Sequence, residues 1–353
     1  MSFVQSLKGG GVERALLRLA AGWQAAGRRV TLVIGNTHGP LADELPKGIE
    51  VRDLHRGDYG SLVRALPGLV RDMSPDLLFC PGNHYTGAAG YARLRLGGAT
   101  PPIVGKVSNS LIRPDFGRVM SWGYRRWLHL HRWILDHVVA MTEGMAAEAA
   151  REMHISRRRI SVIANPLAWP TNHGIATRLP AGRFLVGVGR LEPQKRWDRL
   201  IGALPHLGAA DVGLLLLGEG GLRPTLEAQV ESLGLERRVW MPGHVNDPLP
   251  AVARAEALVL TSDFEGVPGV LREALALGTP VITTDSSVAA REIVSSPRFG
   301  TVVPRDDPAA LIAALDHWLT PGVERPTPTG NNGGDPARDY LDLFDSLVAQ
   351  RNR

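Results

Sequence analysis

The order of apolar segments constrains the fold of this chain more than any other feature of its sequence. Short runs rich in β-forming residues alternate with longer segments of helical character, first between residues 3 and 163 and again between residues 184 and 303. A stretch of Pro, Thr, Asn and Gly at residues 169–180 separates the two sets. Strands that alternate with helices form parallel sheets covered on both faces, so each set predicts one doubly wound, Rossmann-like α/β domain.

A length of 353 residues agrees with two domains of ordinary size. The expected strands are residues 3–6, 30–34, 49–54, 77–80, 103–107, 138–141 and 160–163 in the first domain, and 184–188, 212–217, 239–242, 258–261, 281–284 and 301–303 in the second. We place the first domain at residues 1–168, the linker at 169–182 and the second domain at 183–320. Residues 321–353 are expected to be a second linker and a final helix at about 337–350.

The composition is that of a globular chain, with 44% hydrophobic and 21% charged residues. A single cysteine, Cys80, excludes an intramolecular disulfide framework and agrees with a reducing cytosol. No apolar run reaches the ~18 residues of a membrane span, and residues 1–11 lack the apolar core of a signal peptide. The sequence therefore predicts a cytoplasmic protein.

The net charge of +5 is divided unevenly along the chain. Residues 1–168 hold 22 Lys and Arg against 13 Asp and Glu, whereas the remainder holds 18 against 22. The first half is therefore the basic one, and we expect an anionic partner for it, although not a nucleic acid.

Residues 262–284 have the pattern of a loop, a short helix and a strand. Pro268 suits the first helical position, and Gly278 followed by Pro280 ends the helix. Glu265 in the loop and Glu273 inside the helix are eight positions apart and border the same helix start. The unpaired N–H groups of that start carry partial positive charge and suit a phosphate; they belong to Gly269, Val270 and Leu271. The alternative is an ordinary surface, with Glu265 solvated and Glu273 paired with Arg272 or Arg291.

Three other strand ends carry glycine or cationic residues. Residues 9–11 are a triple glycine before a helix at about 12–26, which is either a ligand loop or a plain turn. Arg190 and Lys195 follow the strand at 184–188, where two cations near a helix start favour a bound anion. The alternative is an Arg190–Glu192 pair and a solvated Lys195. Residues 243–245, Gly-His-Val, follow another strand, and His244 is expected at its rim.

The sequences EGVPGVLREALALGTPVITTD, GVGRLEPQKRWDRLI and GGGVERALLRLA resemble signatures of the retaining GT-B glycosyltransferases of family 4. The resemblance covers most of the chain and is strongest in its second half. It implies two Rossmann-like domains facing across a cleft, with the last helix crossing back to the first domain. It also implies metal-independent transfer of a sugar from a nucleotide diphosphate, expected to be UDP, to a hydroxyl of a lipid-linked or polysaccharide precursor. No cofactor is expected.

The resemblance also assigns roles to particular residues. Glu265 would contact the transferred sugar, Glu273 the ribose, and Arg190 with Lys195 the diphosphate. The backbone at Val245 would meet the nucleotide base. Further backbone contacts to the donor are implied for Gly10, Gly11, Gly266, Val267, Pro268, Gly269, Val270 and Leu271.

The chain departs from the family in the first domain. The family often carries a cleft histidine after the fourth strand, where this chain has Pro81, with Asn83 and His84 a few positions later. His84 is the best candidate for contact with the reacting sugar or the acceptor, and a solvated loop histidine is the alternative. Ser108 and Asn109, at the next strand end, are second candidates.

Other protein classes fit less well. After Gly187 and Gly189, Glu192 stands where a dinucleotide-binding G-x-G-x-x-G requires glycine, and the P-loop pattern is absent. No D-x-D occurs, and His129 and His131 are two apart on an expected helix, so no metal site is predicted. A non-catalytic two-domain binder of a sugar or nucleotide remains the alternative from another class.

An expected helix at residues 117–136 raises a further hypothesis, docking on an anionic membrane. Arginine and tryptophan recur on one face, which suits lipid headgroups; its residues are Arg118, Trp122, Arg125, His129 and Arg132. Other apolar residues are assigned to another face: Met120, Tyr124, Trp127 and Ile134. The alternative is an amphipathic helix with solvated arginines.

Overall fold

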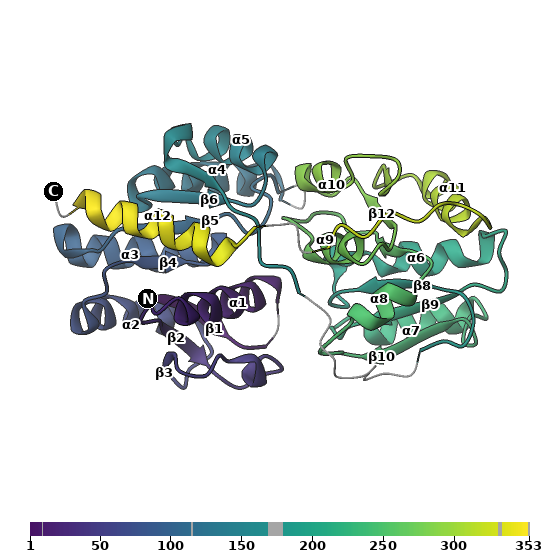
Figure 1. Cartoon of the computed structure of the whole chain (residues 1–353), viewed down its shortest axis with the longest axis horizontal. Helices are drawn as coiled ribbons and strands as arrows, with labels where there is room; N and C mark the ends of the chain where they lie inside the picture. Colours follow the sequence, from purple (N-terminus) through teal and green to yellow (C-terminus); the bar gives the residue numbers. More distant parts are fainter. Residues whose placement is uncertain (9, 114–115, 169–178, 331–333, 352–353) are drawn as a thin grey trace. The chain divides into compact units, whose positions relative to one another are not determined.

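The computed structural model describes residues 1–8, 10–113, 116–168, 179–330 and 334–351 (Figure 1). Contacts divide the chain into two compact units. Unit 1 comprises Met1–Pro166 and Gly333–Arg353, and unit 2 comprises Leu167–Asn332. Most of the expected linker at residues 169–182 lies outside the described residues.

Unit 1 is built on one parallel sheet with strand order β3-β2-β1-β4-β5-β6-β7 in the described residues. Its strands are β1 (Ser2–Ser6), β2 (Thr31–Asn36), β3 (Glu50–Asp53), β4 (Leu78–Cys80), β5 (Ile103–Lys106), β6 (His137–Ala140) and β7 (Ile160–Val162). The strand order reverses beside β1, and ligands of doubly wound sheets bind at the carboxyl ends of strands near such a reversal. The edge formed by the ends of β1, β4 and β5 is therefore the place to look for a site in this unit.

The helices of unit 1 are α1 (Gly11–Ala25), α2 (Tyr59–Met73), α3 (Thr86–Leu96), α4 (Arg118–Ile134), α5 (Glu143–Met153) and α12 (Pro336–Arg351). Helices α2 to α5 pack in chain order, each against the next, whereas α12 packs beside α1. Side-chain caps fix where α2 and α5 begin: Asp58 accepts the N–H of Ser61, and Thr142 accepts that of Met145.

The last helix belongs to the core of unit 1 although it comes from the far end of the chain (Figure 1). Tyr340 and Phe344 of α12 pack against Trp23 of α1 and Phe79 of β4, with ring centroids 5.3–5.9 Å apart. Gly22 lies directly under Ala337, where a side-chain carbon would come within 2.5 Å of the alanine Cβ. The small residue at position 22 thus lets α1 and α12 approach closely.

Unit 2 contains a second parallel sheet with strand order β10-β9-β8-β11-β12-β13. Its strands are β8 (Phe184–Val188), β9 (Gly213–Leu217), β10 (Val239–Gly243), β11 (Leu258–Leu260), β12 (Val281–Thr284) and β13 (Gly300–Val303). Its helices are α6 (Trp197–Ala203), α7 (Arg223–Ser232), α8 (Leu249–Arg254), α9 (Gly269–Ala276), α10 (Val288–Ile293) and α11 (Pro308–Leu319). The central strands β8, β9, β11 and β12 are almost fully buried, as expected for a parallel sheet covered on both faces.

The two doubly wound parallel sheets predicted from the sequence are confirmed, with every expected strand present to within two residues. One local expectation, the first residue of a helix, is wrong. Helix α9 begins at Gly269, one residue later than expected, because Pro268 keeps an extended ψ of 97° and precedes the helix. On α4, which buries mainly Leu128 and His131, Met120 is 60% exposed.

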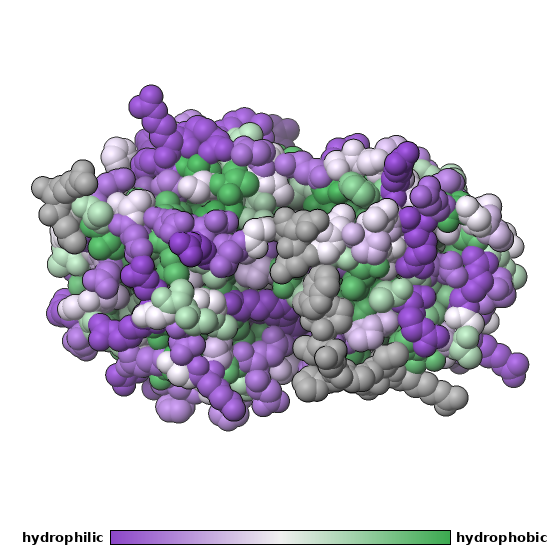
Figure 2. Space-filling view, in the orientation of Figure 1, coloured by the Kyte–Doolittle hydropathy of each residue, from purple (hydrophilic) through white to green (hydrophobic). Residues whose placement is uncertain are grey.

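The surface of the chain is mixed. In the view of Figure 2, apolar residues on the visible face are interspersed with hydrophilic ones. Among the described helices, none combines the length and the apolar character needed to cross a membrane.

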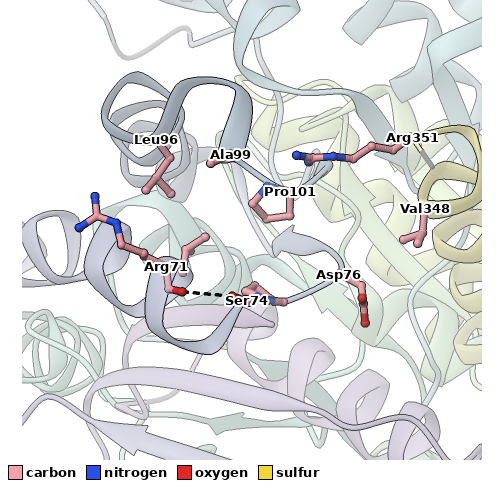
Figure 3. A pocket seen from close by; sticks show the side chains of 10 residues that line it. Arg71, Ser74, Asp76, Leu96, Ala99, Pro101, Val348 and Arg351 are labelled. Atoms are coloured by element: carbon pink, nitrogen blue, oxygen red, sulfur yellow. Dashed lines mark hydrogen bonds between the residues drawn. The ribbon is translucent and has the colours of Figure 1, made fainter. Parts of the chain in front are cut away.

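A cavity of about 320 Å³ lies at the opposite edge of the unit 1 sheet from the strand ends that gather polar groups. It is bounded by the last turn of α2, by Pro101 before β5 and by Arg351 of α12 (Figure 3). The guanidinium of Arg351 already donates to the carbonyls of Thr100 and Gly98, and Ser74 donates to the carbonyl of Arg71. Since these groups have partners and the cavity is at the amino ends of β4 and β5, we do not place the site there.

Candidate functional site

Polar groups gather where β8, β11 and β12 end. These three strands are neighbours in the sheet, so the loops that follow them meet at one edge. Gln194 links the loop after β8 to the loop after β11. Its carbonyl accepts the N–H of Asp263 at 2.9 Å, and its Nε2 donates to the Phe264 carbonyl at 2.7 Å. Glu265 N–H donates to the Ser286 carbonyl at 2.9 Å, which ties in the loop after β12.

The carboxylate of Glu265 lies at the centre of these loops. Lys195 Nζ and Ser262 Oγ both donate to its Oε1 atom, each at 2.6 Å. Glu265 is 8% exposed, so this is a nearly buried ion pair with a neutral hydroxyl donor beside it. Charge-assisted hydrogen bonds of this kind are roughly twice as strong as neutral ones. The sequence predicted Glu265 and Lys195 as site residues, and the structure brings them into direct contact; the alternative of a solvated Glu265 and a solvated Lys195 is wrong.

Arg190 has a different environment from Lys195. Its side chain is exposed and, within the described residues, has no hydrogen bond or ion pair. The alternative pairing with Glu192 is absent, since Glu192 Oε1 instead lies 3.5 Å from the N–H of Gly221. Lys195 ends a short 3₁₀ turn, Pro193–Lys195, and Arg190 lies just after β8. An unpaired guanidinium near a lysine is suited to an anion supplied from solution.

Helix α9 offers backbone donors on the same side of the sheet. In the described residues the N–H groups of Gly269 and Val270 have no acceptor, as expected for a helix start. The N–H of Leu271 is not free, because it donates to the Pro268 carbonyl at 3.1 Å and closes a tight first turn. Of the three donors predicted from the sequence, two are thus available. Gly266 and Val267 lie in the loop between Glu265 and Pro268.

Glu273 lies inside α9 and is not paired with Arg291. Its Oε1 atom accepts the N–H of Ala168 at 3.3 Å, whereas Arg291 is paired with Asp285 at 2.7 Å. Burial lowers the pKa of the neighbouring Arg272 guanidinium, and the charge of Glu273 opposes that shift. Of the alternative pairings for Glu273, only an electrostatic interaction with Arg272 is therefore present.

The loop after β9, whose glycines allow it to pack closely against the loop after β8, was not singled out from the sequence. At Gly218, with φ of 156°, a side-chain carbon would lie 1.9 Å from the carbonyl oxygen of Gly189, and at Gly220 it would lie 2.4 Å from that of Leu191. The loops after β8 and β9 therefore pack backbone against backbone. The repeated glycine at residues 218, 220 and 221 directly after a strand was the available signal.

The loop after β10 carries the residue predicted to meet a nucleotide base. Gly243 ends the strand with φ of 100°, His244 is exposed as expected, and Val245 is half-buried. Glu219 and Arg223 form an ion pair of 2.6 Å beside Gly243. The contact of the Val245 backbone with a base stays a prediction.

Unit 1 has its own group of polar residues at the ends of β4 and β5. Asn83 connects the two loops: its Oδ1 accepts the N–H of Ser108 at 2.7 Å, and its Nδ2 donates to the Asn109 carbonyl at 3.0 Å. His84 follows directly; it is exposed, and its ring centroid lies 3.7 Å from that of Tyr85. Partial burial lowers the pKa of the His84 imidazole, and the charge of Glu13 opposes the shift. Asn83 thus joins the loop that carries His84 to the loop that carries Ser108 and Asn109.

Beside them is a buried group that the sequence did not reveal. Glu13, in the first turn of α1, accepts a hydrogen bond of 3.1 Å from the hydroxyl of Tyr85, which is 1% exposed. Lys106 at the end of β5 is 2% exposed, and its Nζ donates to Asn165 Oδ1 at 2.7 Å. Burial lowers the pKa of Lys106 to about 8, against the opposing attraction of Glu13. A lysine inside an apolar strand pattern was the only sequence signal.

The glycine-rich loop leads into α1. Gly10 is the residue before the helix, and Gly11 begins it with open space around its α-carbon. Their predicted contact with a donor stays a prediction.

Asp263 and Glu265 form a D-x-E sequence, which is the nearest approach to a metal-binding D-x-D near the site. The Asp263 side chain forms ion pairs with arginines. Its carboxylate is 2.7 Å from Arg199 and 3.4 Å from Arg196. Across the part of the chain that the structure describes, no three His, Cys, Asp or Glu side chains are grouped so that they could hold a metal ion.

Two doubly wound parallel sheets, one in each unit, give this protein the fold of the GT-B class. Residues 182–320 match the family described as "Glycosyl transferases group 1", and residues 10–166 match the "Glycosyl transferase 4-like domain". The chain belongs to these GT4-like glycosyltransferases.

Individual relatives agree with this family. The chain is 36% identical over 186 residues to the N-acetylgalactosamine-N,N'-diacetylbacillosaminyl-diphospho-undecaprenol 4-alpha-N-acetylgalactosaminyltransferase of Campylobacter jejuni, covering 52% of this chain and 51% of the relative. It is 31% identical over 165 residues to the lipopolysaccharide 1,6-galactosyltransferase of Salmonella typhimurium, covering 45% of each. The match thus spans about half the length of these curated relatives.

Solved structures show the same fold over nearly the whole chain. WaaG, a glycosyltransferase involved in lipopolysaccharide biosynthesis, has a TM-score of 0.70 at 19% identity, with 99% of this chain and 97% of WaaG covered. Anabaena HepE in complex with UDP and glucose has a TM-score of 0.70 at 20% identity, with 99% and 96% covered.

Proposed function

We propose that the protein is a retaining, metal-independent glycosyltransferase. It transfers a sugar from a nucleotide diphosphate, with UDP as the expected nucleotide, to a hydroxyl of a lipid-linked or polysaccharide precursor. The observation that carries this proposal is the Lys195–Glu265 pair of 2.6 Å beside the free N–H groups of Gly269 and Val270. Support comes from the Campylobacter relative, whose name specifies a diphospho-undecaprenol acceptor, and from HepE, which was solved with UDP and glucose.

In this proposal unit 2 binds the nucleotide sugar. Arg190, Lys195 and the α9 N–H groups hold the diphosphate and stabilise the negative charge that builds on it as the sugar leaves. Such preorganised electrostatic stabilisation is commonly the largest catalytic effect in a site of this type. Glu265 orients the transferred sugar, and Glu273 binds the ribose hydroxyls. The cations replace the metal that other transferases use to neutralise the leaving group.

Unit 1 would bind the acceptor. The loops after β4 and β5, joined through Asn83, present His84, Ser108 and Asn109 at the carboxyl edge of its sheet. Burial favours the neutral form of the His84 imidazole, which can donate one hydrogen bond to a sugar hydroxyl and accept another from it. We propose His84 as the acceptor-side contact.

The surface of α4 supports peripheral contact with an anionic membrane. Its exposed side combines large apolar residues with arginines. The apolar members are Val119, Met120, Trp122, Leu130 and Trp133, and the basic ones are Arg118, Arg125, Arg126 and Arg132. The guanidinium of Arg126 lies over the Trp122 ring at 5.4 Å. Arginine and tryptophan together suit the headgroup region, so we place the protein at the inner face of the cytoplasmic membrane.

A screen of nucleotide sugars tests the enzymatic proposal. The protein is incubated with UDP-, GDP-, ADP- and TDP-linked sugars, and both thermal stabilisation and release of the nucleotide diphosphate are measured. A glycosyltransferase is expected to be stabilised by UDP-sugars and to release UDP slowly to water as a substitute acceptor. The alternative, a non-catalytic binder, would show stabilisation without release; absence of both effects for every nucleotide sugar would contradict the proposal.

A further inference from the structure

The two carboxylate oxygens of Glu265 have different surroundings. Oε1 accepts hydrogen bonds from both Lys195 Nζ and Ser262 Oγ, each at 2.6 Å. Oε2 has no hydrogen-bond partner among the described residues. An ionised carboxylate accepts about two hydrogen bonds on each oxygen. One side of the carboxylate is therefore saturated and the other is available to a ligand.

We propose that Ser262 is a positioning residue for the donor sugar: it fixes the Glu265 carboxylate so that Oε2 is the oxygen presented to a sugar hydroxyl. This inference rests on the proposed function, since it assumes that Glu265 meets the transferred sugar. It assigns to Ser262 a role that acts through Glu265 and not through contact with the substrate.

The case for Ser262, as distinct from Lys195, depends on what a bound diphosphate does to each donor. Lys195 is a flexible cation, and a diphosphate bound by it competes with Glu265 for its three N–H donors. Ser262 carries no charge, so a nearby diphosphate attracts its hydroxyl much less than it attracts the Lys195 ammonium. When the diphosphate draws on Lys195, the Ser262 hydroxyl still holds Oε1 in place.

Ser262 is itself rigidly held. It is fully buried, and its carbonyl accepts the hydroxyl of Thr284 at 2.6 Å. The preceding residue, Thr261, donates its hydroxyl to the Arg196 carbonyl at 2.8 Å. Both contacts involve groups other than the Ser262 hydroxyl, so Ser262→Ala removes only the bond to Glu265 and keeps the backbone contacts of the loop. The substitution therefore separates positioning from loop folding.

The test compares UDP with the UDP-sugar that the wild-type protein hydrolyses fastest. Calorimetry gives both dissociation constants for wild type and for Ser262→Ala, and nucleotide release gives turnover. We expect the dissociation constant for the UDP-sugar to rise about 10-fold, because Glu265 can then rotate away from the sugar. The constant for UDP alone is expected to change less than about 2-fold, because UDP has no sugar to meet Oε2.

A double-mutant cycle identifies the route of the effect. If Ser262 acts only through Glu265, Ser262→Ala in a Glu265→Ala background has no further effect on the ratio of the two dissociation constants. Ser287→Ala is the matched control, since the Ser287 hydroxyl caps α10 by accepting the Ala290 N–H at 3.2 Å and, among the described residues, makes no hydrogen bond with the Glu265 carboxylate. That control is expected to lower the melting temperature and leave the ratio unchanged.

Two results would overturn the inference. Equal weakening of UDP and UDP-sugar in Ser262→Ala would assign Ser262 a purely structural role, and unchanged dissociation constants for both ligands would show that Glu265 is oriented without it. In both cases a wild-type protein that binds and hydrolyses the UDP-sugar leaves the proposed function intact. A wild-type protein that binds no nucleotide sugar overturns the proposed function together with this inference.

Discussion

Arg190 and Lys195 are predicted to share one ligand, but their surroundings differ and so do the consequences of removing them. Each alanine substitution removes a charge-assisted contact of roughly 1.5–3 kcal/mol with the diphosphate, so UDP affinity should fall at least ~10-fold. Arg190 is exposed and unpaired within the described residues, so Arg190→Ala should leave stability within about 0.5 kcal/mol. Lys195→Ala leaves the buried Glu265 without its cation and should also destabilise the protein.

Calorimetry with UDP and urea denaturation measure these two effects separately. Arg199→Ala is an informative comparison, because Arg199 is paired with Asp263 and Asp306 and is expected to affect stability more than UDP binding. Unchanged UDP affinity in both Arg190→Ala and Lys195→Ala would remove the assignment of a diphosphate site.

Lys106 should make stability depend on pH in the alkaline range. Its pKa falls from 10.5 to about 8 in the folded protein because of burial. Between these values the unfolded chain binds more protons than the folded one, so stability contributed by this group rises as pH increases from about 8 to 10.5. Below that range the folded protein carries a buried ammonium with one hydrogen bond, to Asn165.

Lys106→Met is therefore expected to stabilise the protein by about 1–2 kcal/mol at pH 7, with the gain shrinking as the pH is raised toward 10. Urea unfolding of both proteins at several pH values measures the difference. A variant that is less stable than wild type at pH 7, with the same pH slope, would show that Glu13 and Asn165 compensate the charge fully.

His84 is predicted to act on the acceptor side. Because it lies in unit 1, His84→Ala should reduce turnover while leaving the affinity of unit 2 for UDP unchanged. We expect a loss of roughly 10-fold or more in turnover, as for removal of one hydrogen bond to a reacting group. Wild-type turnover in the variant would remove His84 from the site and leave Ser108 and Asn109 as the remaining candidates.

At the scale of single residues, the sequence identified those site residues whose spacing matches a known family motif. Glu265, Glu273 and Lys195 were found because their separations match a family pattern. Ser262, Glu13 and Lys106 were not found, because what distinguishes them is a contact between distant segments. In the sequence, nothing distinguishes Ser262 from other serines; only the fold brings its hydroxyl to the Glu265 carboxylate. Likewise, Lys106 is one of many cations in the basic half of the chain, and only the fold shows that its strand is buried.

At the scale of elements, strands were predicted well for a physical reason. Central strands of a parallel sheet are buried on both faces, so they appear as continuous apolar runs, and 213–217 (GLLLL) is an example. The buried side of a helix is harder to predict than a buried strand. The side that α4 buries is decided by α3 and α5, which pack against it, and a helix rich in both arginine and tryptophan does not reveal that side by its periodicity.

The α4 surface is the element whose function is most directly testable. Each arginine near an anionic bilayer contributes ~1 kcal/mol, screened by salt. Changing Arg118, Arg125 and Arg132 together to Glu should therefore abolish low-salt sedimentation with vesicles of ~30% anionic lipid. All three are exposed, so the fold should be retained.

Two further measurements sharpen the membrane prediction. Wild-type binding should weaken as salt is raised, because exposed charges are screened. Arg158 is an exposed arginine outside α4, and changing it to Glu should have a smaller effect. Vesicle binding that survives the triple change in α4 would show that this face is not the docking surface.

At the scale of the whole molecule, the chain returns to its first unit through α12. The sequence predicted a final helix from the spacing of Tyr340, Leu341, Phe344 and Leu347, and its crossing back from the family resemblance. The packing itself could not be predicted from spacing alone, because a helix with apolar residues on one face fits many surfaces. Here Trp23 and Phe79 receive Tyr340 and Phe344.

Substitutions at Tyr340 test how much the packing of α12 contributes to the stability of unit 1. Its ring is fully buried, so Tyr340→Ala should cost about 3–5 kcal/mol of stability. Its hydroxyl is buried without a hydrogen-bond partner in the described residues, and burial raises the pKa of that hydroxyl. Tyr340→Phe should therefore be neutral or stabilising by about 1 kcal/mol. The pair of variants separates ring packing from the polar atom.

The same two variants also test the division of the chain into units. UDP is proposed to bind unit 2, whereas Tyr340 packs in unit 1, so a folded Tyr340→Ala protein below its melting temperature should bind UDP as the wild type does. Chemical denaturation gives the stability, and calorimetry at low temperature gives the affinity. If Tyr340→Ala weakens UDP binding about as much as Arg190→Ala while remaining folded, the nucleotide site depends on unit 1, and its assignment to unit 2 alone is wrong.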